Sequence, residues 1–136
     1  MGRLTVSVSS KNVRVVELRD EFVDGDAALL VHEASIAFDR GEDMVVDVTM
    51  TKVIDEPVIA ALVVVGRAAR DADSGFVVQC ATGSEVHEQF RPGAGGASLR
   101  RAFSRAEAVA LARVEGTSRR EARPERPGGH TQPARS

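Results

Sequence analysis

The chain has 136 residues, of which 43% are hydrophobic and 28% are charged, and its formal net charge at pH 7 is −2. This length suffices for one domain with a buried core and leaves no room for a second. The sequence has no Trp, no Tyr and a single cysteine, which argues against base-stacking surfaces and excludes an internal disulfide. Without a signal peptide or an apolar run of transmembrane length, we expect a cytoplasmic protein that neither inserts into membranes nor binds nucleic acid.

The N-terminal part of the chain predicts two strands and a helix. Apolar and polar residues alternate from Leu4 to Ser9, and a second, antiparallel strand is predicted over Val13–Leu18. Asp24 or Asp26 is expected to cap a helix that runs to about residue 38 and stops at Gly41. The predicted inner face of this helix consists of Leu29, Leu30, Glu33, Ala34, Ala37 and Phe38.

The middle of the chain predicts a central strand and an apolar helix. Met44–Val48 is a nearly continuous apolar run, which is typical of a strand inside a sheet. Pro57 is well placed as a first helical residue, so a helix is predicted from there to about Asp71. Its apolar residues form two stripes, and we expect part of that surface to bind a protein or to lie under a neighbouring helix. The stripes are Val58, Ala61, Val65 and Ala68, and Ile59, Leu62, Val63 and Gly66.

The C-terminal part predicts two further strands and two helices. A strand over Phe76–Ala81 and a short helix over Ser84–Phe90 precede a glycine-rich connector at 91–96, which lacks the lysine of a phosphate-binding loop. An edge strand over Ser98–Phe103 leads to a capping box at Ser104 and a helix ending near residue 114. The predicted fold class is α/β, a small mixed sheet flanked by helices in the order ββαβαβαβα.

The last 21 residues differ from the body in composition. Residues 1–115 hold 13 basic and 18 acidic residues, whereas 116–136 hold 5 basic and 2 acidic residues, three prolines and only two alanines as apolar residues. Such a segment buries too little surface to offset the entropy of ordering. We therefore predict a domain over 1–115 and a disordered basic tail over 116–136.

The side chains that usually carry catalysis are scattered. His32, His87 and His130 lie on separate predicted segments, so no pair has metal-ligand spacing, and Cys80 sits inside an apolar strand with no nearby base. Adjacent residues of the acid pair before Pro57 point in different directions, which argues against acid–base catalysis. We predict a protein that is not an enzyme and needs no metal or cofactor.

The entrance to the apolar helix carries two acids, Asp55 and Glu56. A helix N-terminus presents free N–H groups and favours negative charge, so these carboxylates could simply cap the helix, each stabilising it by about 1 kcal/mol or less. The alternative is that they mark a docking or signalling site. An anion-binding site for a nucleotide is disfavoured because both acids would repel phosphate.

From the strand through this helix, VVDVTMTKVIDEPVIAALVVVGRAAR resembles STAS-domain proteins, and among them the bacterial anti-sigma factor antagonists. The resemblance implies binding to an anti-sigma factor of the GHKL kinase type, which inactivates such antagonists by phosphorylating the serine after the motif aspartate. Here Glu56 takes the place of that serine, and Pro57 and Val58 replace the following serine and glycine. A second family loop aligns with Glu21, its acid displaced to Asp24.

The resemblance thus predicts a non-catalytic transcription regulator in which Glu56 is a permanent, imperfect mimic of phosphoserine. A STAS subunit that docks on a transporter ATPase or another signalling assembly is the alternative, and a weak homodimer is also expected. The predicted partner-binding and switch residues are Asp55, Glu56, Pro57, Val58, Ala61, Val65, Glu21 and Asp24.

Overall fold

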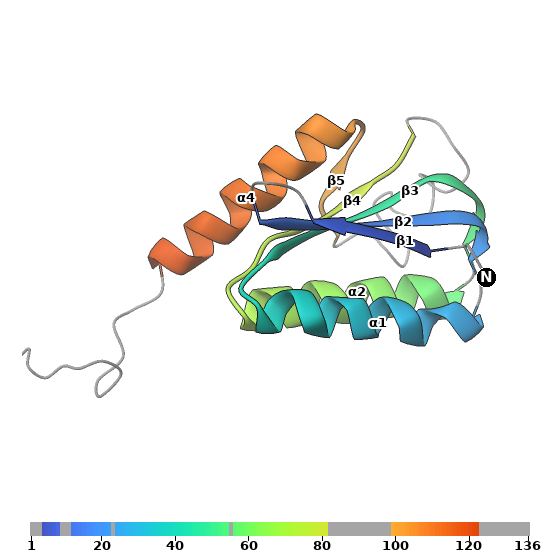
Figure 1. The fold of residues 1–136 in the computed structure, drawn as a ribbon, viewed down its shortest axis with the longest axis horizontal. Coiled ribbons are helices and arrows are strands. Elements are labelled where there is room, and N and C mark those ends of the chain that lie inside the picture. Colours follow the sequence, from blue (N-terminus) through green and yellow to red (C-terminus); the bar gives the residue numbers. More distant parts are fainter. Residues whose placement is uncertain (1–3, 9–11, 23, 55, 82–98, 123–136) are drawn as a thin grey trace, which may run out of the picture.

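The computed structural model describes residues 4–8, 12–22, 24–54, 56–81 and 99–122. They form five strands and three helices (Figure 1). In chain order the elements are β1 (Leu4–Val8), β2 (Val13–Phe22), α1 (Asp24–Asp39), β3 (Asp43–Ile54), α2 (Glu56–Asp71), β4 (Phe76–Gln79), β5 (Arg101–Ala102) and α4 (Arg105–Ala122). The predicted helix over 84–90 and the glycine-rich connector lie outside the described residues.

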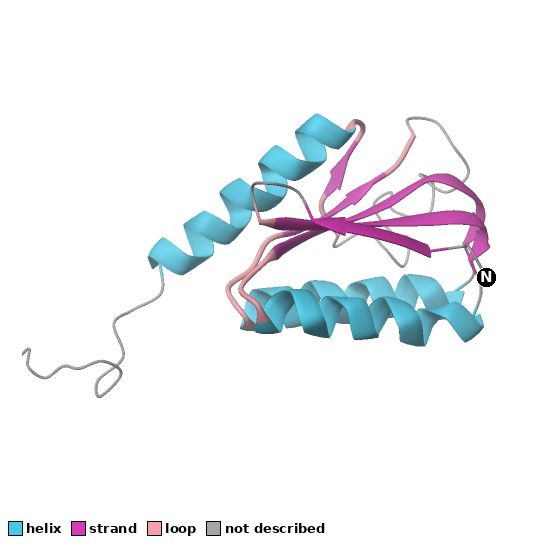
Figure 2. Ribbon diagram, in the orientation of Figure 1, coloured by secondary structure: helices cyan, strands magenta, loops and turns pink. Residues whose placement is uncertain are grey.

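The strands form one mixed sheet with the order β1-β2-β3-β4-β5. The β1–β2 pair is antiparallel, as predicted, and the other three pairs are parallel. Helices α1 and α2 lie side by side on one face of the sheet, and α4 crosses the other face (Figure 2). The predicted central strand is confirmed as β3, and the α/β class with a small mixed sheet is confirmed as well.

Two clusters of buried side chains fill the two sides of the sheet. The strand period of two sends Met44, Val46 and Val48 of β3 into the cluster under α1 and α2, while Val45 faces α4. Since β3 is covered on both faces, its apolar run is continuous rather than alternating. The smaller cluster consists of Val13, Val15, Val45, Val77, Ala102, Ala108 and Ala112.

Helix α1 follows the predicted boundaries closely and ends before Gly41, whose φ of +74° suits glycine. Leu30, Ala34 and Ala37 of its predicted inner face are buried. The prediction for Leu29 was wrong, because this side chain is 52% exposed. At 100° per residue, Leu29 lies a quarter turn away from Leu30, on the side that neither the sheet nor α2 covers.

Helix α4 corrects the predicted boundary between domain and tail. It continues past residue 115 to Ala122, so residues 116–122 are helical rather than disordered. Polar contacts hold this extension: Arg119 donates to the carbonyl of Ser74, and Arg120 donates to the Asp43 carboxylate at 3.2 Å. Apolar burial alone does not predict this extension, because arginine contacts anchor it. Residues 123–136 lie outside the described residues.

Two strands are longer than predicted and two are shorter. β2 and β3 extend to Phe22 and Ile54, because they pair with each other well beyond the predicted ends, through two register shifts. Strands β4 and β5 are shorter than predicted and contain only four and two residues.

Candidate functional site at the start of helix α2

The carboxyl ends of β2 and β3 place the starts of two helices at one edge of the sheet. The two strands are parallel, and Glu21 pairs with Val53 and Phe22 with Ile54. Helix α1 begins at Asp24 and α2 at Glu56, each two positions after the last residue of its strand. Both helix N-termini therefore emerge at the same edge (Figure 1).

Glu56 is the first residue of α2 and its side chain is exposed. Within the described residues, no hydrogen bond or ion pair engages its carboxylate. A carboxylate at this end of a helix is favoured by the helix dipole and keeps its lone pairs free for a cationic group. The next residue, Pro57, is exposed as well, in keeping with the tolerance of a first turn for proline.

Other predicted site residues are placed less completely. Asp55 lies outside the described residues, and for Glu21 and Asp24 the structure describes the backbone alone. The position of Glu21 on β2 and of Asp24 on α1 brings these two residues to the same edge as Glu56, as the register above requires. Their roles remain predictions.

Three of the predicted partner-binding residues are buried, which corrects their assignment. Val58, Ala61 and Val65 are 0%, 8% and 1% exposed and belong to the core cluster under α2. Ile59 and Leu62 of the second stripe are buried too. Because α2 packs against both the sheet and α1, half of its sixteen residues are buried or partly buried. The part of α2 that a partner can reach consists of Glu56, Pro57, Ala60, Val64, Arg67, Ala68, Arg70 and Asp71.

A shallow groove of about 340 Å³ runs between α1 and α2. Val31 and Val64 stand on its walls with 37% and 51% exposure, and the two acids in its lining, Asp39 and Asp71, end the two helices. The groove is therefore apolar along its length and electronegative where the helices terminate.

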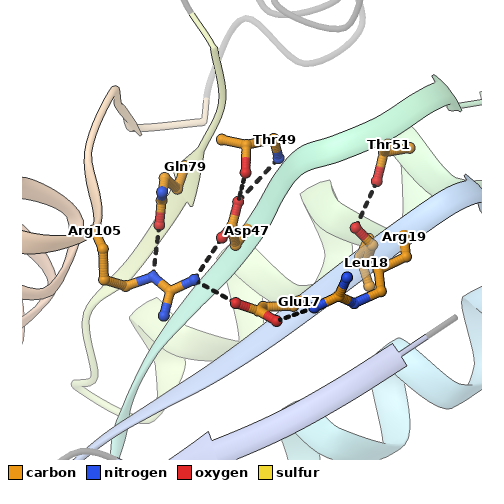
Figure 3. Close-up of polar contacts among 8 residues, drawn as sticks. All are labelled: Glu17, Leu18, Arg19, Asp47, Thr49, Thr51, Gln79 and Arg105. Atoms are coloured by element: carbon orange, nitrogen blue, oxygen red, sulfur yellow. Dashed lines mark hydrogen bonds and ion pairs between the residues drawn. The ribbon is translucent and has the colours of Figure 1, made fainter. Parts of the chain in front are cut away.

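A polar network that the sequence analysis missed occupies the opposite face of the sheet (Figure 3). Arg105, the first residue of α4, donates to Asp47 on β3, to Glu17 on β2 at 2.8 Å and to Gln79 on β4 at 2.8 Å. Asp47 also accepts from the backbone N–H and the hydroxyl of Thr49, at 2.9 and 2.7 Å. One guanidinium thus ties the start of α4 to three adjacent strands.

The charge of this guanidinium is well supported. Burial disfavours the charged form, but hydrogen bonds to Glu17 and Asp47 outweigh it, so the pKa of Arg105 is raised above its ordinary value. In the sequence, Asp47 was the residue that could have indicated this polar network, because it is the one charge inside the predicted central strand. A permanently charged arginine held by two carboxylates is suited to anchoring a helix rather than to proton transfer.

A further reactive group is the thiol of Cys80. Cys80 is buried, and desolvation raises the pKa of its thiol, only partly opposed by the charge of Arg101. Among the described residues, no three His, Cys, Asp or Glu side chains come together as metal ligands would. In the same part of the chain, no helix has the length and apolarity required to cross a bilayer.

Comparison with known proteins rests on structure. No family model and no curated protein matches the sequence. The structure of the anti-sigma factor antagonist SpoIIAA in its unphosphorylated form superposes with a TM-score of 0.63 at 12% identity, over 83% of this chain and 98% of that one. The chain has the SpoIIAA-like STAS fold.

Two further structures extend this likeness. Moorella thermoacetica RsbS, in a variant with a serine replaced by glutamate, shares the STAS fold with a TM-score of 0.66 at 17% identity, covering 87% of this chain and 99% of that one. A sulfate transporter family protein from Wolinella succinogenes gives 0.60 at 17% identity, over 80% and 90% of the two chains. At such identities the STAS likeness concerns the fold, which regulators and a transporter family protein share.

Proposed function

We propose that the protein is a non-catalytic STAS regulator of the anti-sigma factor antagonist type that binds an anti-sigma factor of the GHKL kinase class in the cytoplasm. Glu56 stands where such antagonists present a modifiable serine. Its exposure at the first position of α2, without a partner among the described residues, is the observation that supports the proposal best.

A glutamate at position 56 removes the regulation by phosphorylation that a serine allows. It carries one negative charge, compared with about −1.5 to −2 for phosphoserine, and has no hydroxyl for a kinase to modify. SpoIIAA is known in both phosphorylated and unphosphorylated forms, whereas a kinase cannot switch Glu56 between two such forms. In this proposal the chain binds constitutively, with an affinity between those of an unphosphorylated and a phosphorylated antagonist.

The buried apolar stripes narrow the surface that a partner would contact. The proposal assigns the contact to Glu56, Pro57 and Ala60, together with the edge formed by Glu21 and Asp24.

The test compares Glu56→Ser with the unchanged protein against purified GHKL-type anti-sigma kinases and labelled ATP. We expect the unchanged protein to bind without incorporating label at position 56, and Glu56→Ser to gain kinase-dependent label or to change its affinity by about tenfold, the equivalent of one charge-assisted contact. Glu121→Ser, an exposed change on α4, is the matched control. Failure to bind any kinase would defeat the proposal, and identical behaviour of both variants would reduce Glu56 to a helix cap.

The likeness to a sulfate transporter family protein supports a second candidate, a STAS subunit that docks on a transporter or signalling assembly. The same edge of the sheet would then contact an ATPase or another STAS domain. Affinity purification of the tagged protein separates the two: recovery of a sigma-regulating kinase supports the first, and recovery of transport subunits supports the second.

A further inference from the structure

The exposed seam of helix α2 has a spacing that reads the same in both directions. Glu56, Ala60, Val63 and Arg67 follow one another at intervals of four, three and four residues, which places them in one row along the helix. Glu56, Ala60 and Arg67 are exposed and Val63 is partly buried. The row has an acid at one end, a base at the other and small apolar residues between them. It is therefore complementary to a second copy of itself that runs in the opposite direction.

We infer that the row, here called the α2 seam, is a docking surface for a second copy of this chain. Two seams that run antiparallel about a twofold axis place Glu56 of each copy opposite Arg67 of the other, and Ala60 opposite Val63. Neither Glu56 nor Arg67 has a hydrogen-bond or ion-pair partner among the described residues. Both charges are therefore available for the contact.

Charge selects the register of this pairing. A shift of one helical turn places Glu56 opposite Asp71, another exposed acid of α2, which adds repulsion in place of attraction. Reversal of the helices also sets the positive end of each dipole beside the negative end of the other. The small side chain of Ala60 lets the two helices approach closely, and Val64, 51% exposed, flanks the seam.

The contact is small. Sixteen residues of α2 span about 24 Å, and one helix face of this length buries less than the roughly 800 Å² per partner of a standard interface. The geometry therefore predicts a weak dimer that exchanges with monomer. Because the dimer covers Glu56, self-association and binding of another protein at that carboxylate exclude each other.

Cross-linking tests the predicted register directly. In a Cys80→Ser background, Ala60→Cys and Val63→Cys proteins are mixed under mild oxidation at low salt. We expect the mixed disulfide between positions 60 and 63 to form several-fold faster than either symmetric disulfide, and faster than one from Ala110→Cys on the exposed side of α4. Mixed disulfide no faster than the α4 control would overturn the inference.

Charge exchange provides an independent test by sedimentation equilibrium. Glu56→Arg or Arg67→Glu alone should weaken the dimer by about tenfold, since each creates two like-charge pairs across the twofold axis. The combined Glu56→Arg and Arg67→Glu protein recreates both pairs and should restore the original dissociation constant. Circular dichroism verifies folding of each variant, and a double variant as weak as the single ones would contradict the α2 seam. Neither test involves a kinase, so the outcome is separate from that of the proposed function.

Discussion

Substitution of Gly116 by alanine separates local helix preference from tertiary packing. Alanine is favoured over glycine inside a helix by about 1 kcal/mol, so the sequence of α4 alone predicts a gain in stability. In the fold, however, an added Cβ would stand 2.0 Å from Oδ1 and 2.7 Å from Cγ of Asp43. The carboxylate would have to move.

Asp43 is not free to move without cost. It is 3% exposed, and its Oδ1 accepts the Gly75 N–H at 2.9 Å and Arg120 Nη1 at 3.2 Å. Bonds to a charged group contribute about 1.5–3 kcal/mol each. Displacement of this oxygen should cost about 3 kcal/mol, which exceeds the gain in propensity, so we expect Gly116→Ala to destabilise the protein by about 2 kcal/mol.

Urea unfolding followed by circular dichroism measures the change, with Ala110→Gly at an exposed position of α4 as a calibration that should lose about 1 kcal/mol. In an Asp43→Ala background the obstacle is absent, and Gly116→Ala should become neutral or stabilising. The double-mutant cycle isolates this coupling. An increase in the urea midpoint for Gly116→Ala in the otherwise unchanged protein would refute the reasoning.

Three further predictions concern the rest of the fold. Arg105→Leu should lower the free energy of unfolding by about 2 kcal/mol, because Asp47 is left buried without its cation. Adding Asp47→Asn to this variant should recover part of the loss, and urea unfolding measures both changes. Leu29→Ser should change stability by less than about 0.5 kcal/mol, whereas Leu30→Ala should cost about 2–5 kcal/mol; equal effects in thermal unfolding would contradict the assigned inner face of α1. The pKa of Cys80 is raised in the folded protein, so the stability that this thiol contributes is complete below the ordinary thiol pKa and is lost as pH rises through the folded value. Cys80→Ala should therefore flatten the decline of the free energy of unfolding at alkaline pH. An unchanged slope would contradict a neutral buried thiol.

Local pattern was sufficient for most elements of this chain. The apolar run of β3 led to a strand inside the sheet, and Pro57 and Gly41 led to helix boundaries within one or two residues of those observed. These signals are encoded in neighbouring residues, through the strand period, the fixed φ of proline and the conformational freedom of glycine. The position of Glu56 at a helix entrance could be predicted for the same reason.

What depended on contacts between distant segments could not be read from the chain. Whether Val58, Ala61 and Val65 face a partner or the core depends on where α1 packs, and the fold buries them. The extension of α4 to Ala122 depends on arginine contacts with the turn before β4 and with Asp43 at the start of β3, although the same residues looked like a solvated tail. Periodicity tells that a helix has an apolar side, but the direction of that side and the partners of its charges are set by residues far away in sequence.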